Sequence, residues 1–487
     1  MGEQVGISGT GTFTQTGGTH TVTGTFVDGG NSGGTGTYNF SGGTLTIADE
    51  YVGYDGIGTF IQTGGTNTIT GSTGGLFRVG RDPGSQGYYT LSDGILNANA
   101  EQVGVSGTGT FTQTGGTNTV TGTLTVAANA GSAGTYNLQG GSLTATAIIV
   151  NEGGVFTEAG GNLAVTTLTV SGGTFNLAGV SQQVSSLSDG GVTTGAITDS
   201  SDTPATLTVN QTINPIFGGV ISGNLALTKS GTGTLALTGA NTYTGATTIN
   251  AGTPNFASGS LGSSSIVFNG GTLQWASGNT QDISGQIAPL ATGQTAILDT
   301  NGNTVTFASP ISGAGGFLTG AGGLTKQGAG TLILTSTNTY IGATTISAGI
   351  LQLRDGAPFD DGSIASTKIV DNASLVFDTF GSQNPSAVIS GSGSLSKLGT
   401  GTLLLTQAEK YKGTTFIGSG IVQLGVANAL PKTTLLTVTG SVLAHLPALS
   451  SEELPNYLPD LWKRDLMAEQ RAALNAHQAS LGRGVVK

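Results

Sequence analysis

Residues 59–66 read Thr-Phe-Ile-Gln-Thr-Gly-Gly-Thr, an aromatic residue followed four and five positions later by two glycines. Longer copies flank this stretch, because residues 3–25 recur almost unchanged at 101–123, an offset of 98 residues. The same rule, with Asp-Gly once replacing Gly-Gly, holds at Phe13, Tyr38, Phe60, Tyr89, Phe111, Tyr136 and Phe156. Their separations of 20 to 29 residues are typical of a chain built from short stacked repeats.

One such separation fits one coil of a parallel β-helix, in which three short strands and three turns return the chain to a point above its start. Within a coil, Thr12-Phe13-Thr14 alternates polar and apolar residues, which indicates that Phe points inward and Thr outward. Stacking then places the seven aromatic residues above one another as an internal ladder. The sequence therefore predicts an all-β fold, a single-stranded parallel β-helix (solenoid) of roughly 20 coils.

The glycine pairs are predicted to form corners of the coils. Gly17, Gly64 and Gly115 open three of these pairs, and glycine adopts the positive φ that β-branched residues resist. Composition agrees with this architecture, since 86 of the 487 residues are Gly and only 8% are charged. This composition argues against an α/β enzyme, whose helices need charged outer faces. The glycines also do not recur at every third position, which excludes collagen.

A different repeat occupies residues 204–448. Its first copy reads Lys-Ser-Gly-Thr-Gly-Thr-Leu from Lys229 and Asn-Thr-Tyr-Thr-Gly-Ala-Thr-Thr-Ile up to Ile249. A second copy follows 97 residues later, and a third, less complete copy ends at Ile417. The recurring positions are Lys229, Lys326 and Lys397, together with Tyr243, Tyr340 and Tyr411. We interpret the three lysines as solvated charges on a strand or at a sheet edge, where Lys is usually found.

The run Lys-x-Gly-x-Gly-Thr-Leu, followed by Asn-Thr-Tyr-x-Gly-Ala-Thr-Thr-Ile-x-Ala-Gly, resembles the autotransporter-associated β-strand repeat of bacterial type V secretion proteins. The resemblance covers about residues 204–448, and residues 1–203 are similar to companion repeats of such passenger regions. It implies a right-handed β-helical stalk at the cell surface or outside the cell, associated with the outer membrane in the full-length protein. It also implies a translocator barrel C-terminal to the passenger in that protein.

The composition changes near residue 449, because the last 39 residues hold 10 of the 41 charged residues. Pro459 in a first turn and Gly482 as a stop predict a helix over residues 459–481. Three interpretations of the tail remain open: a cap on the solenoid, the start of a truncated domain, or non-native sequence. The predicted parts of the chain are residues 1–203, 204–448 and 449–487.

Charge and residue usage exclude several functions. The net charge of −11 and the lack of a basic stripe exclude nucleic acid as a partner. The absence of Cys removes disulfides, metal–thiolate sites and thiol nucleophiles. No apolar run reaches the ~18 residues of a membrane-spanning helix, and Met1-Gly2-Glu3-Gln4 lacks the basic and apolar regions of a signal peptide. Because the chain begins inside a repeat, we expect it to be a fragment.

A glycan-processing β-helix enzyme is one alternative function, and it requires acidic residues that converge with basic residues or His. The candidate carboxylates lie beside glycines or turns, where Asp caps its own backbone; they are Asp49, Glu50, Asp82, Asp93, Asp360 and Asp361. The histidines, His20, His445 and His477, are far apart in the sequence, and His20 aligns with Asn67 and Asn118. We therefore predict no catalytic residue, no metal ligand and no cofactor.

Rows of threonines suggest a second alternative, an ice-binding module. Thr at alternate positions would form a flat surface of hydroxyl and methyl groups, and the rows are Thr19, Thr21 and Thr23, Thr66, Thr68 and Thr70, and Thr117, Thr119 and Thr121. The unequal coil lengths disfavour the even lattice that such a surface needs. We favour a non-enzymatic cell-surface or secreted passenger stalk for adhesion, aggregation or structural display, with a host or neighbouring-cell glycan or protein as partner.

Overall fold

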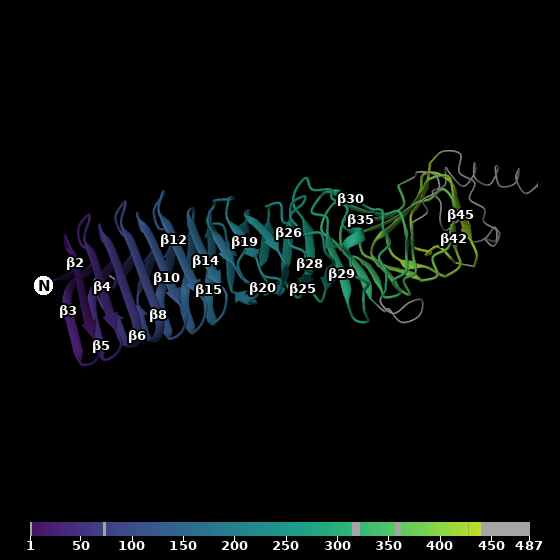
Figure 1. Cartoon of the computed structure of the whole chain (residues 1–487). Helices are drawn as coiled ribbons and strands as arrows, with labels where there is room; N and C mark the ends of the chain where they lie inside the picture. The colour runs from purple at the N-terminus through teal and green to yellow at the C-terminus, as the bar shows by residue number, and fades with distance from the viewer. Residues whose placement is uncertain (1, 72–74, 314–321, 356–361, 427, 440–487) are drawn as a thin grey trace, which may run out of the picture. The chain divides into compact units, whose positions relative to one another are not determined.

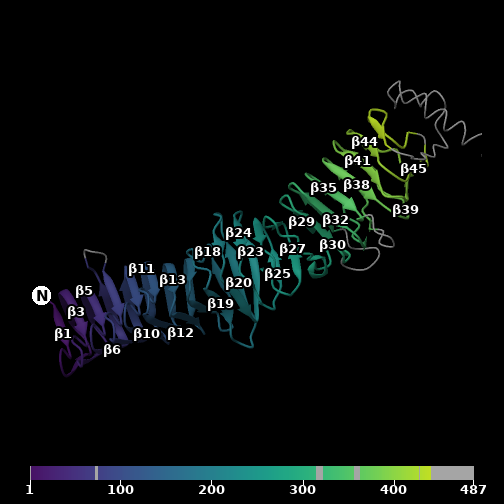
Figure 2. The ribbon, with the colours of Figure 1, turned by 90° about the horizontal axis from the view of Figure 1, so that it is seen from above.

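The computed structural model describes residues 2–71, 75–313, 322–355, 362–426 and 428–439. The chain divides into two compact units, Met1–Asn279 and Thr280–Lys487. Each unit consists of short strands joined by turns (Figures 1 and 2). The predicted helix over 459–481 and the whole tail 449–487 lie outside the described residues, as do His445, His477, Asp360 and Asp361.

The coils of the first unit stack so that each strand pairs in parallel with the equivalent strand of the next coil. The aromatic positions show the register, because Phe13 pairs with Tyr38, Tyr38 with Phe60, and Phe60 with Tyr89. Figure 1 shows these coils following one another from the purple strands onward. Parallel stacking satisfies the backbone groups of each coil through its two neighbours. The predicted all-β parallel solenoid is confirmed, with about 19 coils in the described ranges.

The strands of the first unit belong to three sheets, called rows below, and the largest of these contains two stacks of equivalent strands. The longest row is a sheet of nineteen strands: β1 (Glu3–Val5), β2 (Thr10–Gln15), β3 (Thr19–Asp28), β4 (Thr35–Phe40), β5 (Thr44–Val52), β6 (Ile57–Ile69), β7 (Leu76–Val79), β8 (Gln86–Ala98), β9 (Ala100–Val103), β10 (Thr108–Gln113), β11 (Thr117–Val126), β12 (Ala133–Leu138), β13 (Ser142–Asn151), β14 (Gly154–Glu158), β15 (Asn162–Ser171), β16 (Thr174–Asn176), β18 (Ser186–Ser188), β19 (Ala196–Asp199) and β22 (Val220–Gly223). The second row contains β17 (Gln182–Val184), β20 (Ala205–Asn210), β23 (Leu225–Ser230), β25 (Thr247–Ile249) and β27 (Ile266–Phe268). The third row contains β21 (Ile216–Phe217), β24 (Thr234–Leu237), β26 (Thr253–Phe256) and β28 (Thr272–Trp275).

The second unit contains a short 3-10 helix, η1 (Ser284–Gln286), and parallel strands in four rows. The first row contains β29 (Thr295–Asp299), β31 (Gly323–Gln327), β34 (Thr344–Ile346), β37 (Ile369–Asp371), β40 (Ile389–Gly391) and β43 (Lys410–Tyr411). The second contains β30 (Thr304–Phe307), β32 (Thr331–Leu334), β35 (Ile350–Leu353), β38 (Ser374–Asp378), β41 (Ser394–Leu398), β44 (Thr415–Ile417) and β46 (Leu436–Val438). The remaining rows are β33 (Thr337–Asn338) with β36 (Ser363–Ile364), and β39 (Ser382–Gln383) with β42 (Thr402–Leu405) and β45 (Ile421–Leu424).

Side chains alternate between the interior of a coil and its outer face. In β13, Leu143 and Ala145 are buried before a bend in the strand, and Ile148 and Val150 are buried after it. Burial of one such large aliphatic side chain contributes about 1.5–3 kcal/mol. The core of each unit is therefore a column of small clusters, each formed by two or three strands of one coil and their stacked neighbours.

The two glycines of each corner pair have different roles. The positive φ falls on the second glycine, with values of +70° at Gly65 and +63° at Gly116. The first glycine lies against the previous coil, since a Cβ atom on Gly64 would lie 2.4 Å from the Ser41 carbonyl oxygen. At Gly115 the corresponding distance, to the Ser92 carbonyl oxygen, would be 2.1 Å. A side chain at Gly64 or Gly115 would therefore push neighbouring coils apart.

Candidate functional site

The seven aromatic residues of the first repeat stack face to face inside the coils. Successive ring centroids lie 4.6–5.0 Å apart, in the order Phe13, Tyr38, Phe60, Tyr89, Phe111, Tyr136 and Phe156. Phe175 continues the stack 5.0 Å beyond Phe156, although it is followed by Gly179 and Val180 rather than by two glycines. Phe and Tyr alternate over the seven predicted positions, so every second ring brings a hydroxyl group into the interior.

A buried hydrogen-bonded network surrounds the Tyr89 hydroxyl. The hydroxyl donates to Oε1 of Gln62 at 2.5 Å. The Asn67 amide donates to Oε2 of Glu50 at 2.8 Å and to the Tyr89 hydroxyl at 3.4 Å. All four side chains are fully buried. We call such a cluster of Glu, Gln, Asn or His, and Tyr a polar tetrad.

Three polar tetrads occur along the first unit: Glu3, Gln15, His20 and Tyr38; Glu50, Gln62, Asn67 and Tyr89; and Glu101, Gln113, Asn118 and Tyr136. We call the paired, equivalent positions of successive coils a column. The coil between two tetrads carries apolar residues in the columns of the tetrad residues. Phe26 lies between Glu3 and Glu50, and Phe77 lies between Glu50 and Glu101. The offset of 98 residues in the sequence is therefore four coils, or two polar and two apolar layers.

The position of Glu50 corrects a prediction. We expected Glu50 to serve a turn, but it lies within β5 and points into the core, where burial raises its pKa to about 8. Burial also raises the pKa of Glu101 to about 8. Both carboxyl groups are therefore mainly protonated at neutral pH. The error arose because a strand places adjacent residues on opposite faces, so Asp49 remains outside the core while Glu50 enters it.

The other candidate acids serve backbone or surface contacts. Asp49 Oδ1 accepts a hydrogen bond from the Leu76 backbone N–H at 2.9 Å. Asp93 Oδ1 accepts one from the Gly94 N–H at 2.7 Å, and Asp82 forms an ion pair with Arg81 at 2.8 Å. The structure brings none of these three carboxylates together.

The threonine rows of the first unit are interrupted. Thr19 pairs with Thr44 and Thr44 with Thr66 on neighbouring coils. The next residue in this row is Ile95, which pairs with both Thr66 and Thr117. An apolar side chain thus divides the hydroxyl surface that an ice-binding module would require.

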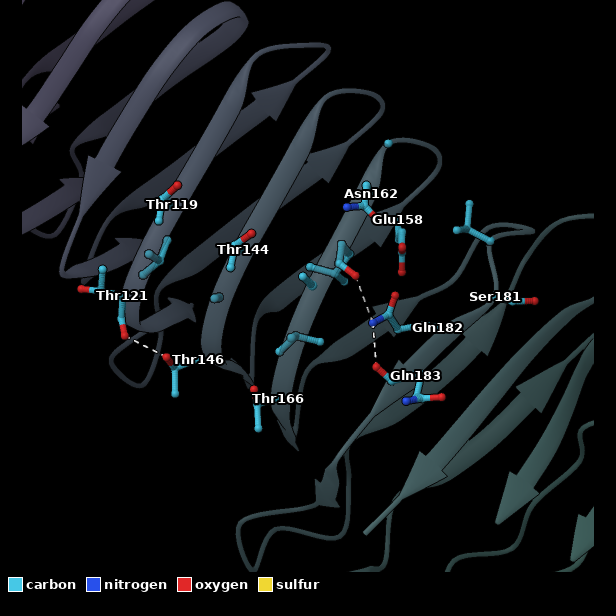
Figure 3. Close-up of a pocket in the computed structure, with 17 residues that line it drawn as sticks. Thr119, Thr121, Thr144, Thr146, Glu158, Asn162, Thr166, Ser181, Gln182 and Gln183 are labelled. Carbon is cyan, nitrogen blue, oxygen red and sulfur yellow. Dashed lines mark hydrogen bonds between the residues drawn. The ribbon is translucent and has the colours of Figure 1, made fainter. Parts of the chain in front are cut away.

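A groove of about 740 Å³ lies where the regular stacking of the first unit is interrupted. Strand β15 pairs with β13 from Asn162 to Ser171, but with β18 only over residues 167–169. On that second edge, residues 162–165 have no strand partner in the described part of the chain. Figure 3 shows the outward threonines on one side of this groove and Gln182 and Gln183 on the other.

Glu158 lines this groove without a tetrad around it. It occupies the column of Gln113, two coils farther along. The other three tetrad columns hold Ile148, Leu163 and Phe175 at this level. Oε2 of Glu158 has no hydrogen-bond partner, and the residue is 1% exposed. Burial raises its pKa to about 8.

The three tyrosines of the second repeat are buried and each is fixed by a threonine four residues later. The Tyr hydroxyl lies within hydrogen-bond distance of the Thr hydroxyl at 2.6 Å for Tyr243, 2.9 Å for Tyr340 and 2.5 Å for Tyr411. The Tyr-x-Gly-x-Thr pattern therefore forms a closed local contact inside the coil.

The three lysines of the second repeat are buried, so our prediction of solvated charges is wrong. Lys229, Lys326 and Lys397 are each at most 1% exposed. Each ammonium group donates to backbone carbonyls of the turn that follows it; Lys326 Nζ lies 2.6 Å from the Gln327 oxygen and 2.8 Å from the Gly328 oxygen. Burial lowers the pKa of Lys229 and of Lys326 to about 8. The backbone carbonyl groups of this turn point inward and accept the hydrogen bonds that the ammonium group would otherwise make to water.

Comparison with protein families places these lysines and tyrosines in known repeats. The family described as Passenger-associated-transport-repeat matches residues 227–253, 324–353 and 395–424. Each match contains one buried lysine and one Tyr–Thr pair. The chain carries three passenger-associated-transport repeats.

A curated relative agrees with the passenger repeats. The chain is 34% identical over 224 residues to a protein of Brucella suis biovar 1 (strain 1330) named "Adhesin BmaC autotransporter". The similarity covers 45% of this chain and 6% of that protein. The chain thus corresponds to a small part of the length of the relative it matches.

The passenger repeats and the groove occupy different parts of the molecule. The repeats lie between residues 227 and 424, whereas the tetrads and the groove are formed by residues before 184. Within the described ranges, no group of three His, Asp or Glu side chains is arranged to hold a metal ion. No helix in those ranges has the length and hydropathy needed to cross a membrane.

Proposed function

We propose that this chain is a surface-exposed part of an autotransporter passenger and that it serves as an adhesive stalk rather than as an enzyme. The observation that carries the proposal is the occurrence of three passenger repeats in one chain. The similarity to a protein named as an adhesin supports it. A translocator elsewhere in the full-length protein would then bring the chain to the cell surface.

The interior of the coils supports a mechanical role. Aromatic stacking in the region 1–203 holds successive coils at a fixed spacing, and the buried lysines in the region 204–448 fix the turns that follow them. Because each coil contacts mainly its neighbours, folding can begin at one place and spread coil by coil. We propose that these two regions are two segments of one stalk, with the ladder residues and lysines as its structural residues and the outer faces as its contact surface.

Adhesion can be tested with the purified chain. Beads coated with the folded chain should bind to cells or extracellular matrix more than beads coated with the same chain after heat unfolding. Self-aggregation of the coated beads without added cells would instead favour aggregation as the function. Turnover of surface polysaccharides by the purified chain would contradict a non-enzymatic role, and absence of all binding would contradict adhesion.

A further inference from the structure

Three glutamines in the first unit reach from one coil to the next in the same way. Gln15 Nε2 donates to the Thr44 carbonyl oxygen at 3.1 Å. Gln62 donates to that of Ile95 at 2.9 Å, and Gln113 to that of Ser142 at 2.9 Å. In each case the acceptor is the strand partner of the residue four positions after the glutamine, as the pairs Thr19–Thr44, Thr66–Ile95 and Thr117–Ser142 show.

Glu158 occupies the fourth position of this series, but its acceptor is missing. The residue four positions later is Asn162, which pairs with Ser142 on the previous coil. On the other edge of β15, no described strand pairs with Asn162. The carbonyl group that would receive a hydrogen bond from residue 158 is therefore absent, and Oε2 of Glu158 lacks a partner.

A side chain partly occupies the place of the missing strand. Gln182 Nε2 donates to the Leu163 carbonyl oxygen at 3.3 Å and to the Gln183 carbonyl oxygen at 2.9 Å (Figure 3). Strand β17, to which Gln182 belongs, pairs with β20 and not with β15. The amide thus provides one of the contacts that the backbone of an adjacent strand would normally make.

We propose that the groove binds one extended polypeptide segment of a partner protein, which adds a parallel strand to residues 162–165 of β15 and accepts a hydrogen bond from the Glu158 carboxyl group. Strand addition at a sheet edge gains affinity from main-chain hydrogen bonds and specificity from alternate side chains. The inference goes beyond the proposed function, because the groove would bind such a segment whether or not the chain is displayed on a cell.

The groove defines the chemistry of the segment. Leu163 and Val165 would face its inward residues, so these should be apolar. Its outward residues would lie beside Ala164 and Gln183, so these should be small and uncharged. Glu158 is the only ionisable residue among those that line the groove, and its raised pKa keeps it protonated and able to donate at neutral pH. The described strands of this chain already pair with one another, which favours a segment from a different protein.

The chain itself supplies a suitable probe sequence. Residues 140–147, Gly-Gly-Ser-Leu-Thr-Ala-Thr-Ala, include the first six residues of β13, the strand that pairs with the other edge of β15. A fluorescently labelled peptide of this sequence should bind the purified chain at pH 6, measured by fluorescence anisotropy. The same peptide N-methylated at alternate residues retains its side chains but loses backbone donors, and it should bind at least tenfold more weakly.

Two substitutions test the role of Glu158. Glu158→Gln restores the donor that Gln15, Gln62 and Gln113 use, so peptide affinity should stay within about twofold and should not change between pH 6 and 9. Glu158→Leu introduces the residue found at Leu138 and Leu177 in the same column, and it should weaken binding about tenfold. Glu152→Leu removes an exposed charge outside the groove and should leave affinity unchanged.

The outcomes separate the proposal from its alternatives. Equal binding of the N-methylated peptide, or unchanged affinity in Glu158→Leu with an unchanged circular dichroism spectrum, would overturn strand addition. Binding of a neutral oligosaccharide in place of the peptide would also overturn it. Self-association of the chain that depends on Glu158 would show a second copy, rather than a partner protein, as the occupant.

Discussion

The Tyr89 hydroxyl donates a 2.5 Å hydrogen bond to Oε1 of Gln62, a residue of the preceding coil. The ring of Tyr89 also stacks on Phe60 of that coil at 4.8 Å. One side chain thus joins two coils by an apolar contact and by a polar contact. The same combination occurs at Tyr38 and Tyr136, so it is a general connection of the first unit.

Removal of the Tyr89 hydroxyl should destabilise the first unit. Tyr89→Phe preserves the stacked ring but leaves the buried Oε1 atom of Gln62 without the hydroxyl donor of Tyr89, and we expect a loss of about 1–3 kcal/mol in the free energy of unfolding. Denaturant unfolding followed by circular dichroism measures this change. The matched control is Tyr88→Phe, because Tyr88 is 39% exposed and its hydroxyl contacts Gln86 at the surface. Equal effects of the two substitutions would contradict a structural role for the tetrad.

The buried carboxyl groups should make stability decrease with pH. Below about pH 4.5, Glu50 and Glu101 are protonated in both the folded and the unfolded chain. As the pH rises toward 8, the unfolded chain ionises first, because burial raises the folded pKa of each group from 4.5 to about 8. Above pH 8, the free energy of unfolding is lower than at pH 4 by at most roughly 5 kcal/mol per carboxyl group.

The double variant Glu50→Gln, Glu101→Gln tests this pH dependence. Its melting temperature should fall less between pH 5 and 8.5 than that of the unchanged chain. Some decrease should remain, since burial also raises the pKa of Asp28 and of Glu158 to about 8. Glu152→Gln, at an exposed position, serves as the control. Parallel melting curves for the double variant and the unchanged chain would show that these two groups do not titrate as described.

Gly349 should tolerate no side chain. Its φ is +70°, and a Cβ atom there would lie 2.4 Å from the Gly330 carbonyl oxygen and 2.9 Å from Lys326 Nζ. Gly302 also has a positive φ, +84°, but a Cβ atom there would meet nothing within 4 Å. We expect Gly302→Ala to cost about 1–2 kcal/mol from backbone strain, and Gly349→Ala to cost about 1–3 kcal/mol more from the clash. Thermal melting of both variants measures the difference, and equal losses would contradict the close packing around Lys326.

The sequence was sufficient for the stacking direction and the aromatic ladder. Residues such as Phe13 and Phe111 recur with a threonine on each side, and few folds other than a stack of coils accommodate that pattern. The sequence was not sufficient to predict the burial of Glu50 and Lys326, because charged residues near glycines or turns are usually solvated. The inward carbonyl groups that accept hydrogen bonds from Lys326 depend on the conformation of the turn. The signal for the tetrads was present in the spacing of Gln15, Gln62 and Gln113, which recur at every second coil rather than at each one.

Because Tyr and Phe alternate along the ladder, coils with a buried hydroxyl group alternate with coils that lack one. A folding chain that omitted one coil would stack Phe111, which has no hydroxyl, where Tyr89 belongs. Oε1 of Gln62 would then lack its donor in an apolar interior. Only an error of two coils at once would restore the pattern. The buried tyrosines and glutamines should therefore destabilise any arrangement in which the coils are shifted by one.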